Sequence, residues 1–337
     1  MFIQKKVSKM DFRHGTGIAS DKDLMFMSWG KNIFNNKPFF VLKYFPDKKG
    51  KRQLEGQRFS KVKPPLYAYN EMIDTAEEFD ESLVSYSELL KRDILDLESS
   101  EIEVFDPVEK AGEMVKNPSD KVEKQFREMR EFFSGIIEEE NLDLEIGVTA
   151  SLLFGLHDPE SSDIDLVFYG SKKELEKLQT RIKKLVDEEV LKLDLSSFEK
   201  QVVEETMNEE FSDDLKKRIV EEKRYLSSFE HEKADTEIHL QYVDTEPLND
   251  IGGGEGVGRK KIVGKVTKKS SANYVCPEFT VSNKEGDFEV ICYHKSGSLI
   301  KQGDEVSLEG YMIEKQGKKF MVLLDEKADH LKLVGDN

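Results

Sequence analysis

The chain carries at residues 147–170 the stretch GVTASLLFGLHDPESSDIDLVFYG, which decides how we interpret the fold. Its second half, Ser162 to Tyr169, is rich in β-branched and aromatic residues and has turn residues on both sides, which predicts a strand. Side chains alternate between the two faces of a strand, so we expect Asp163 and Asp165 to point to one face. Two neighbouring carboxylates resist ionising together and favour a bound cation, and Mg²⁺ prefers such oxygen ligands.

A second feature lies just before this strand. A short helix is predicted from Ser151 to Leu156, directly after a run of small residues that begins at Gly147. The backbone N–H groups and the dipole at the start of a helix attract phosphate. A phosphate-binding turn, then a loop, then a carboxylate pair is the order we expect in a site that transfers a nucleotidyl group.

These residues resemble the signature of the polymerase-beta-type nucleotidyltransferase superfamily, which is Gly-Ser, a helical turn with Gly, and then Ser-Asp-x-Asp-Leu. The longer run from Gly147 to His157 and the closing Val-Phe-Tyr-Gly are similar to an archaeal group of predicted nucleotidyltransferases. The chain departs from the superfamily at Ala150, where Gly is preferred, and the added methyl would restrict the backbone or push a phosphate away. The matching positions are Ser151, Gly155, Ser162, Asp163 and Asp165.

The resemblance implies an α+β fold and a Mg²⁺-dependent enzyme that moves an NMP group from an NTP to an acceptor hydroxyl. Asp163 and Asp165 would be catalytic and would ligate the metal. The residues implied to bind the nucleotide phosphates are Ala150, Ser151, Gly155 and Ser162.

The superfamily usually places a third carboxylate on a neighbouring strand. Residues 236–243 alternate as a strand would, with Glu237, His239 and Gln241 on one face. We expect Glu237 to be the third catalytic carboxylate. Asp194 is the alternative candidate for the third carboxylate. Glu237 could also be an exposed strand residue without a functional role.

The patterns divide the 337 residues into several parts. Residues 1–105 are predicted to form a basic, mostly-β module, with a short helix around Ser85 to Leu97. Residues 106–248 are predicted to form the nucleotidyltransferase domain, entered by a helix start at Asp106 and a longer helix over residues 120–140. A flexible Gly-rich linker is expected at 249–258, and the short strands of 259–337 predict an OB-like β domain.

The net charge of −17, from 51 basic and 68 acidic residues, disfavours a general nucleic-acid coat protein. Residues 1–66 reverse this balance, with 15 Lys and Arg against 5 Asp and Glu. This basic cluster could bind the phosphate backbone of RNA or DNA, and so could an OB-like barrel, but a charge run is more often only a solvated surface. The cluster consists of Lys48, Lys49, Lys51, Arg52, Arg58, Lys61 and Lys63.

The two cysteines, Cys276 and Cys292, are too few for a disulfide scaffold or a four-cysteine zinc site. They favour packing roles in a reducing compartment. The sequence shows neither a signal peptide nor an apolar run of membrane-spanning length, so we expect a cytoplasmic protein with no membrane partner.

Two alternatives to a nucleic-acid-modifying enzyme remain open. The first is a catalytically degenerate nucleotidyltransferase fold that serves as a nucleic-acid-binding module, which the departure at Ala150 favours. The second is a nucleotidyltransferase that modifies a hydroxyl group of a protein.

Overall fold

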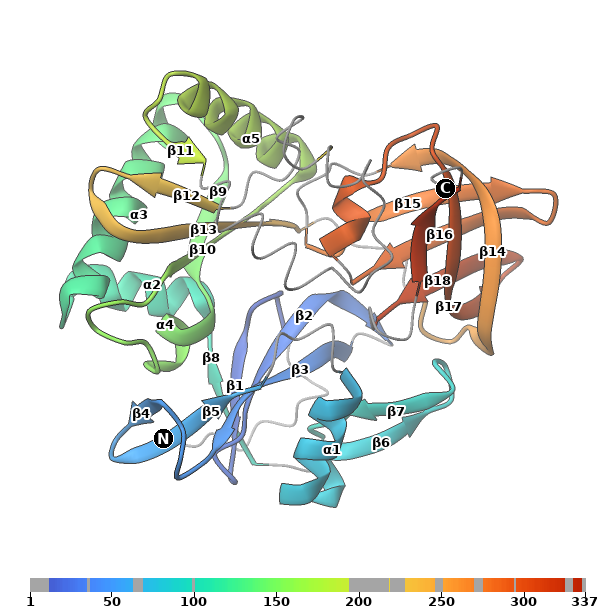
Figure 1. Ribbon diagram of the computed structural model, residues 1–337, viewed down its shortest axis with the longest axis horizontal. Coiled ribbons are helices and arrows are strands. Elements are labelled where there is room, and N and C mark those ends of the chain that lie inside the picture. Colours follow the sequence, from blue (N-terminus) through green and yellow to red (C-terminus); the bar gives the residue numbers. More distant parts are fainter. Residues whose placement is uncertain are drawn as a thin grey trace.

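The computed structural model describes residues 12–34, 37–62, 69–98, 101–193, 218, 228–245, 251–269, 275–293, 295–324 and 330–334. Figure 1 shows three parts: an N-terminal sheet in blue, a helix-covered sheet in green and yellow, and a C-terminal barrel in orange and red. The fold is therefore α+β, with a mixed sheet flanked by two β structures, as the sequence predicts.

The N-terminal part is a six-stranded sheet in the order β4-β5-β3-β2-β1-β8, with antiparallel neighbours. Its strands are β1 (Gly17–Ser20), β2 (Met25–Phe34), β3 (Lys37–Pro46), β4 (Arg52–Leu54), β5 (Gln57–Lys61) and β8 (Ile102–Phe105). The elements between β5 and β8 are α1 (Tyr69–Phe79), the 3-10 turn η2 (Glu81–Leu83), β6 (Val84–Ser87) and β7 (Arg92–Leu95).

The predicted helix over Ser85 to Leu97 is wrong, because these residues form the β6–β7 hairpin. Lys91, in its turn, has a φ of +51°, a left-handed conformation that a right-handed helix does not contain. The apolar spacing that resembled a helix is satisfied instead by burying Leu90 and Leu95 from the two ends of the hairpin.

The middle part is a five-stranded sheet in the order β11-β12-β13-β10-β9. Strands β10 and β13 are parallel, and the other neighbours are antiparallel. The elements are α2 (Pro107–Lys116), α3 (Lys121–Glu139), β9 (Leu144–Val148), α4 (Ala150–Phe154), β10 (Ile164–Gly170), α5 (Lys172–Asp187), β11 (Lys192–Leu193), β12 (Ser228–His231) and β13 (Ala234–Asp244).

Side-chain caps define the helix starts in this part. Asp106 accepts hydrogen bonds from the backbone of Val108 and Glu109, which confirms the predicted start of α2. Asp120 caps α3, and Ser171 caps α5. The Asp120 cap places α3 where the sequence predicts a long helix over residues 120–140.

The two faces of the β10–β13 pair differ in chemistry. Ile164, Leu166 and Phe168 pack with apolar residues of α3, α5 and β13 in one buried cluster. The other side of the strand pair contacts the N-terminal part. The Tyr169 hydroxyl donates to the carbonyl of His14 at 2.6 Å, and His14 Nε2 lies 3.1 Å from the Gln241 amide oxygen. The helices therefore support the sheet from one side, while the N-terminal part covers the polar side.

The C-terminal part is a closed barrel. Strand β14 pairs with both β15 and β17, and β16 pairs in parallel with β18, which closes a five-stranded barrel. Its elements are β14 (Glu255–Lys269), β15 (Glu278–Asn283), β16 (Gly286–Cys292), the 3-10 turn η3 (Lys295–Leu299), β17 (Glu305–Lys315), β18 (Lys318–Leu323) and β19 (His330–Leu333).

Part of the segment predicted as a flexible linker belongs to this barrel. Strand β14 begins at Glu255 and pairs with the end of β17, and Ile251 is fully buried. Gly256 lies so close to the backbone of Leu89 that a Cβ atom would stand 2.3 Å from its carbonyl oxygen. Glycine there permits close backbone contact rather than chain flexibility.

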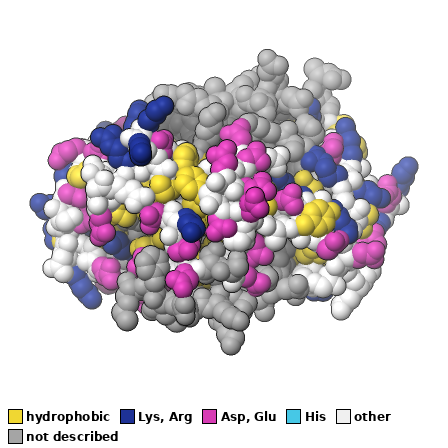
Figure 2. Space-filling view, turned by 90° about the horizontal axis from the view of Figure 1, so that it is seen from below, with side chains coloured by type: hydrophobic (Ala, Val, Ile, Leu, Met, Phe, Trp, Pro, Cys, Tyr) yellow, Lys and Arg dark blue, Asp and Glu magenta, His cyan; other side chains and the backbone are white. Residues whose placement is uncertain are grey.

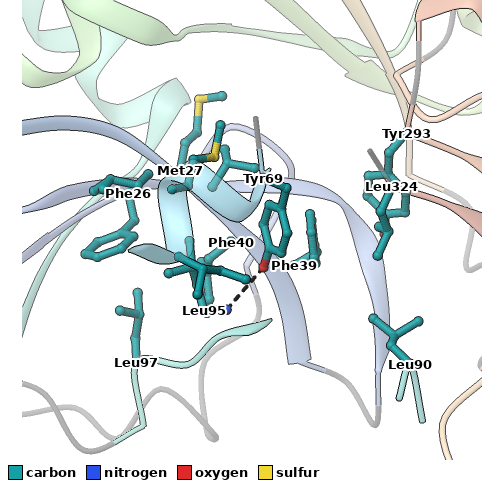
Figure 3. Packing of buried hydrophobic residues seen from close by; sticks show 14 of the residues in the cluster. Phe26, Met27, Phe39, Phe40, Tyr69, Leu90, Leu95, Leu97, Tyr293 and Leu324 are labelled. Carbon is teal, nitrogen blue, oxygen red and sulfur yellow. Dashed lines mark hydrogen bonds between the residues drawn. The ribbon is translucent and has the colours of Figure 1, made fainter. Parts of the chain in front are cut away.

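The N-terminal part and the barrel share one hydrophobic cluster, shown in Figure 3. Phe39 of β3 packs against Tyr69 of α1 and Tyr293 after β16, with ring centroids 4.7 and 5.1 Å apart. The Tyr69 hydroxyl accepts a hydrogen bond from the backbone of Leu95 at 3.1 Å. Each buried aromatic of this kind stabilises the contact by about 1.5–3 kcal/mol, so the barrel is held to the N-terminal part by packing.

Charged side chains of both signs are interspersed on the face in Figure 2, which views the molecule from the side of the N-terminal sheet. Within the part of the chain that the structure describes, none of the helices combines the length and the apolar character needed to cross a membrane.

Candidate active site

The two aspartates of the central motif meet at the start of β10. Asp165 lies in the strand and its side chain is 12% exposed, whereas Asp163 precedes the strand and its side chain is 41% exposed. Both carboxylates approach the same ring nitrogen of His239, as expected for side chains on one face. The pair therefore has one buried member and one member open to solvent.

His239 completes this group. It stands directly opposite Asp165 in the parallel β10–β13 register. Its Nδ1 atom lies 3.3 Å from Asp165 Oδ1 and 3.5 Å from Asp163 Oδ2. One ligand atom from each of the three residues lies within 4.8 Å of the others, so the group fits a metal ion.

Glu237, the predicted third carboxylate, lies one step behind this group. Its Oε1 atom is 2.9 Å from His239 Nε2, an ion-pair contact with the ring nitrogen that does not approach the aspartates. The position opposite Asp165 thus holds a histidine, and Glu237 touches the far side of its ring. The alternative, Asp194, lies outside the described residues.

The charges in this group perturb one another. The negative charge of Asp165, with burial, raises the pKa of Asp163. Burial opposes ionisation of Asp165, but contact with His239 and its positive charge lower the pKa of that carboxyl. Burial likewise opposes protonation of His239, yet contacts with Asp165 and Glu237 raise its pKa to about 10.

The small-residue turn lies beside the aspartates. The Thr149 backbone N–H donates to the carbonyl of Asp165 at 3.2 Å, which fixes the start of α4 against β10. Ala150 has a φ of +55°, in the left-handed region that favours glycine. Ser151 follows, buried, with its hydroxyl against that of Tyr44 from the N-terminal sheet.

The other two predicted phosphate-binding residues shape the loop between α4 and β10. Gly155 ends α4 with a φ of +68°, while the Leu156 N–H donates to the carbonyl of Ser151. The Ser162 hydroxyl accepts hydrogen bonds from the backbone of Asp158 at 2.7 Å and from Arg52 at 2.9 Å. Both residues hold the loop that delivers Asp163.

Basic side chains reach the site from the N-terminal sheet. Arg52 of β4 contacts Ser162, and the positive charges of Lys61 and Lys43 help to lower the pKa of Asp165. Arg52 and Lys61 belong to the predicted basic cluster, but nothing in the sequence indicates that they approach the aspartates. Lys63 of that cluster lies among the residues that the structure leaves undescribed.

A buried polar chain, which the sequence does not reveal, links the N-terminal part to the turn. His14 accepts a hydrogen bond from the Gly30 N–H at Nδ1, and its Nε2 faces Gln241. The Gln241 amide in turn donates to the Thr149 hydroxyl at 3.5 Å. Burial lowers the pKa of His14 to about 4, so this histidine is neutral at pH 7.

The site thus combines a helix-backed mixed sheet with paired carboxylates beside a tight turn. Residues 128–226 match the family model described as nucleotidyltransferase domain, so the chain contains such a domain. The match includes α4 and both aspartates but ends before β13 and His239. A search of curated proteins finds no match to the chain.

Proposed function

We propose that the protein is a divalent-metal-dependent nucleotidyltransferase that moves an NMP group from an NTP to an acceptor hydroxyl. The observation that carries this proposal is the convergence of Asp163 and Asp165 beside the Thr149–Ser151 turn, inside the segment that matches the nucleotidyltransferase domain. We also propose that the chain is related to an archaeal group of predicted nucleotidyltransferases. We further propose that its domains are divided at residues 105, 248 and 258.

In this proposal Asp163 and Asp165 hold the metal, for which the sequence predicts Mg²⁺. A bound dication neutralises charge on the triphosphate and on the attacking and leaving oxygens. The Ala150 backbone and the Ser151 hydroxyl would position the phosphates, and Arg52 and Lys61 would add positive charge at the rim.

The proposal assigns supporting roles to three other residues. Gly155 and Ser162 would keep the loop in the shape that presents Asp163. Glu237 remains our candidate for the third catalytic carboxylate, and its 2.9 Å contact with His239 supports a role exerted through that ring. Asp194 remains the alternative.

The acceptor hydroxyl is proposed to belong to RNA or DNA bound by the basic N-terminal cluster and the barrel. Arg52 contacts Ser162, next to Asp163, and the positive charge of Lys61 acts on both aspartates. This supports the assignment, because a polyanion on that surface would lie next to the reacting group. A protein acceptor is the alternative. The left-handed Ala150 supports a second candidate function, a degenerate fold that binds nucleic acid without catalysis.

A screen of the four labelled NTPs against RNA, DNA and total protein tests the proposal. We expect label to enter one acceptor class in a metal-dependent way, and the Asp163→Asn, Asp165→Asn double variant to lose transfer while keeping its far-UV circular dichroism. Equal labelling by the wild type and the double variant would remove the aspartates from the chemistry. Binding of nucleic acid without any labelling would support the degenerate fold.

A further inference from the structure

The third member of the site is an imidazole, and this bears on which metal the site holds. His239 lies opposite Asp165 across the β10–β13 pair and faces both aspartates. We propose that Asp163, Asp165 and His239 together bind one transition-metal dication through His239 Nδ1, in preference to Mg²⁺. Only the catalytic role of the ion rests on the proposed function, because the metal site itself is inferred from the ligand geometry.

The distances within the group resemble those between ligands of one ion. A charge-assisted hydrogen bond between a ring nitrogen and a carboxylate is about 2.7–2.9 Å long. The His239 Nδ1 contacts are longer than this, at 3.3 and 3.5 Å. Ligands about 2.1 Å from a shared ion are separated by roughly 3.0–3.4 Å, depending on whether the arrangement is octahedral or tetrahedral.

The far side of the ring supports the same orientation. His239 Nε2 is buried, and its nearest acid is the Glu237 carboxylate at 2.9 Å. A cation bound at Nδ1 would displace the proton that the ring carries there without an ion, and the Glu237 carboxylate would keep the remaining proton on Nε2, as is usual for metal-binding histidines. Glu237 thus directs Nδ1 toward the two aspartates.

The donor chemistry then selects the class of metal. Mg²⁺ is bound by oxygen ligands and water, whereas imidazole suits zinc and its neighbours in the first transition row. Replacing a third carboxylate by imidazole therefore shifts the preference from Mg²⁺ toward ions such as Co²⁺ and Zn²⁺, with Mn²⁺ between them.

The first experiment detects the ligand in the wild-type protein without nucleotide. Mn²⁺ is added, and electron spin echo envelope modulation is recorded to detect a coordinated nitrogen. We expect ¹⁴N modulation from one imidazole. A bound Mn²⁺ with no nitrogen modulation, or no Mn²⁺ binding at all, would overturn the inference, and this result does not depend on the folding of any variant.

The second experiment measures affinities by calorimetry with Co²⁺ and Mg²⁺. We expect the wild type to bind Co²⁺ at least about tenfold more tightly than Mg²⁺. His239→Asn should lose at least about tenfold in Co²⁺ affinity, with little change in Mg²⁺ affinity. His239→Asp should reduce the ratio of Co²⁺ affinity to Mg²⁺ affinity. His157→Asn, in the other group of two acids and a histidine, is the matched control and should leave Co²⁺ affinity unchanged. An unchanged Co²⁺ affinity in His239→Asn would contradict the assignment.

These outcomes are separate from those of the transfer assay. Nitrogen ligation without labelling of any acceptor would contradict the proposed function but support the metal site. Labelling supported by Mg²⁺, with no nitrogen ligand to Mn²⁺, would support the function and refute His239 as a ligand.

Discussion

Two regions of the middle part of the chain place two acids and a histidine within ligand distance: Asp163, Asp165 and His239 at the sheet, and Asp120, Glu123 and His157 at the start of α3. We call the first the sheet cluster and the second the cap cluster. Their composition is nearly the same, but their carboxylates are used differently.

In the cap cluster the acids are occupied by the chain itself. Asp120 accepts from the Glu123 N–H at 2.9 Å and pairs with His157 Nε2 at 2.7 Å, a length typical of a charge-assisted hydrogen bond. Glu123 accepts from the backbone and hydroxyl of Ser119 at 2.6 and 2.8 Å. Asp120 therefore caps α3, and Glu123 holds Ser119, the residue before the cap.

In the sheet cluster the contacts of His239 with the aspartates are longer, at 3.3 and 3.5 Å, than the 2.7 Å contact between His157 and Asp120. Like-charged neighbours and partial burial destabilise their ionised pair, which a cation would relieve. The comparison teaches that residue types alone do not mark a site. What matters is whether backbone donors already satisfy the carboxylates.

The largest expected difference between the clusters is in catalysis. Asp165→Asn should reduce transfer by at least about a hundredfold, because even residues that only contact metal ligands are worth about 10–100-fold. Asp120→Asn should retain activity within a few-fold, because its carboxylate serves α3. Rates with labelled NTP, compared at equal folded fraction, check this. Similar losses of transfer activity in both variants would contradict the assignment of catalysis to the sheet cluster alone.

The second prediction concerns the buried His14, whose ring contacts the Gln241 amide. His14 has a pKa of about 4 when folded and 6.5 when unfolded, so only the unfolded chain takes up its proton between these values. Its contribution to stability is therefore full above pH 6.5 and is lost as pH falls toward 4, by about 3 kcal/mol at about 1.4 kcal/mol per pKa unit.

Urea unfolding at pH 7 and pH 4.5 measures this loss. His14→Gln, which does not titrate in this range, should show a smaller decrease in unfolding free energy on acidification. The difference between the proteins removes the contribution of the other acids. If both lose the same stability, burial of neutral His14 is not what acid disrupts.

Much of the fold is predictable from short-range pattern. The alternation around Asp163 and Asp165 predicts β10, and the apolar stripe from Val122 to Ile136 predicts α3. The cap at Asp106 depends on residues two and three positions away, so the sequence is enough to locate it.

Features that depend on distant parts of the chain are not predictable in this way. Glu237 and His239 share one face of β13, and only the parallel register with β10 decides that His239 lies opposite Asp165. The approach of Arg52 depends on how the N-terminal sheet packs against the loop before β10. Residues 85–97 form the β6–β7 hairpin rather than the predicted helix. Burial in the cluster shared with the barrel, and not the local preference of these residues, decides their structure.

The third prediction tests the structural role of the cap cluster. Asp120→Ala removes the cap of α3 and leaves His157 Nε2 without its partner, so it should lower the unfolding free energy by about 2 kcal/mol. Ser171→Ala, which removes only the longer 3.4 Å cap bond of α5, is the control and should cost about 1 kcal/mol or less. Equal losses would show that the His157 contact adds nothing.

The smallest expected effect concerns the backbone beside the sheet cluster. Ala150 is held at a φ of +55°, and an L-residue pays roughly 1–2 kcal/mol for this conformation, whereas glycine does not. Glycine is also more flexible when unfolded, which offsets about 0.5–1 kcal/mol of that gain. Ala150→Gly should therefore raise the unfolding free energy by at most about 1 kcal/mol, and it should leave transfer unchanged or faster because a methyl group is removed beside the proposed phosphates.

Ala76→Gly, in the ordinary helix α1, should instead destabilise the protein by about 1 kcal/mol or more. If chemical denaturation shows that both substitutions destabilise alike, the turn at Ala150 is not strained, and the strain that separates the sheet cluster from the relaxed cap cluster is absent.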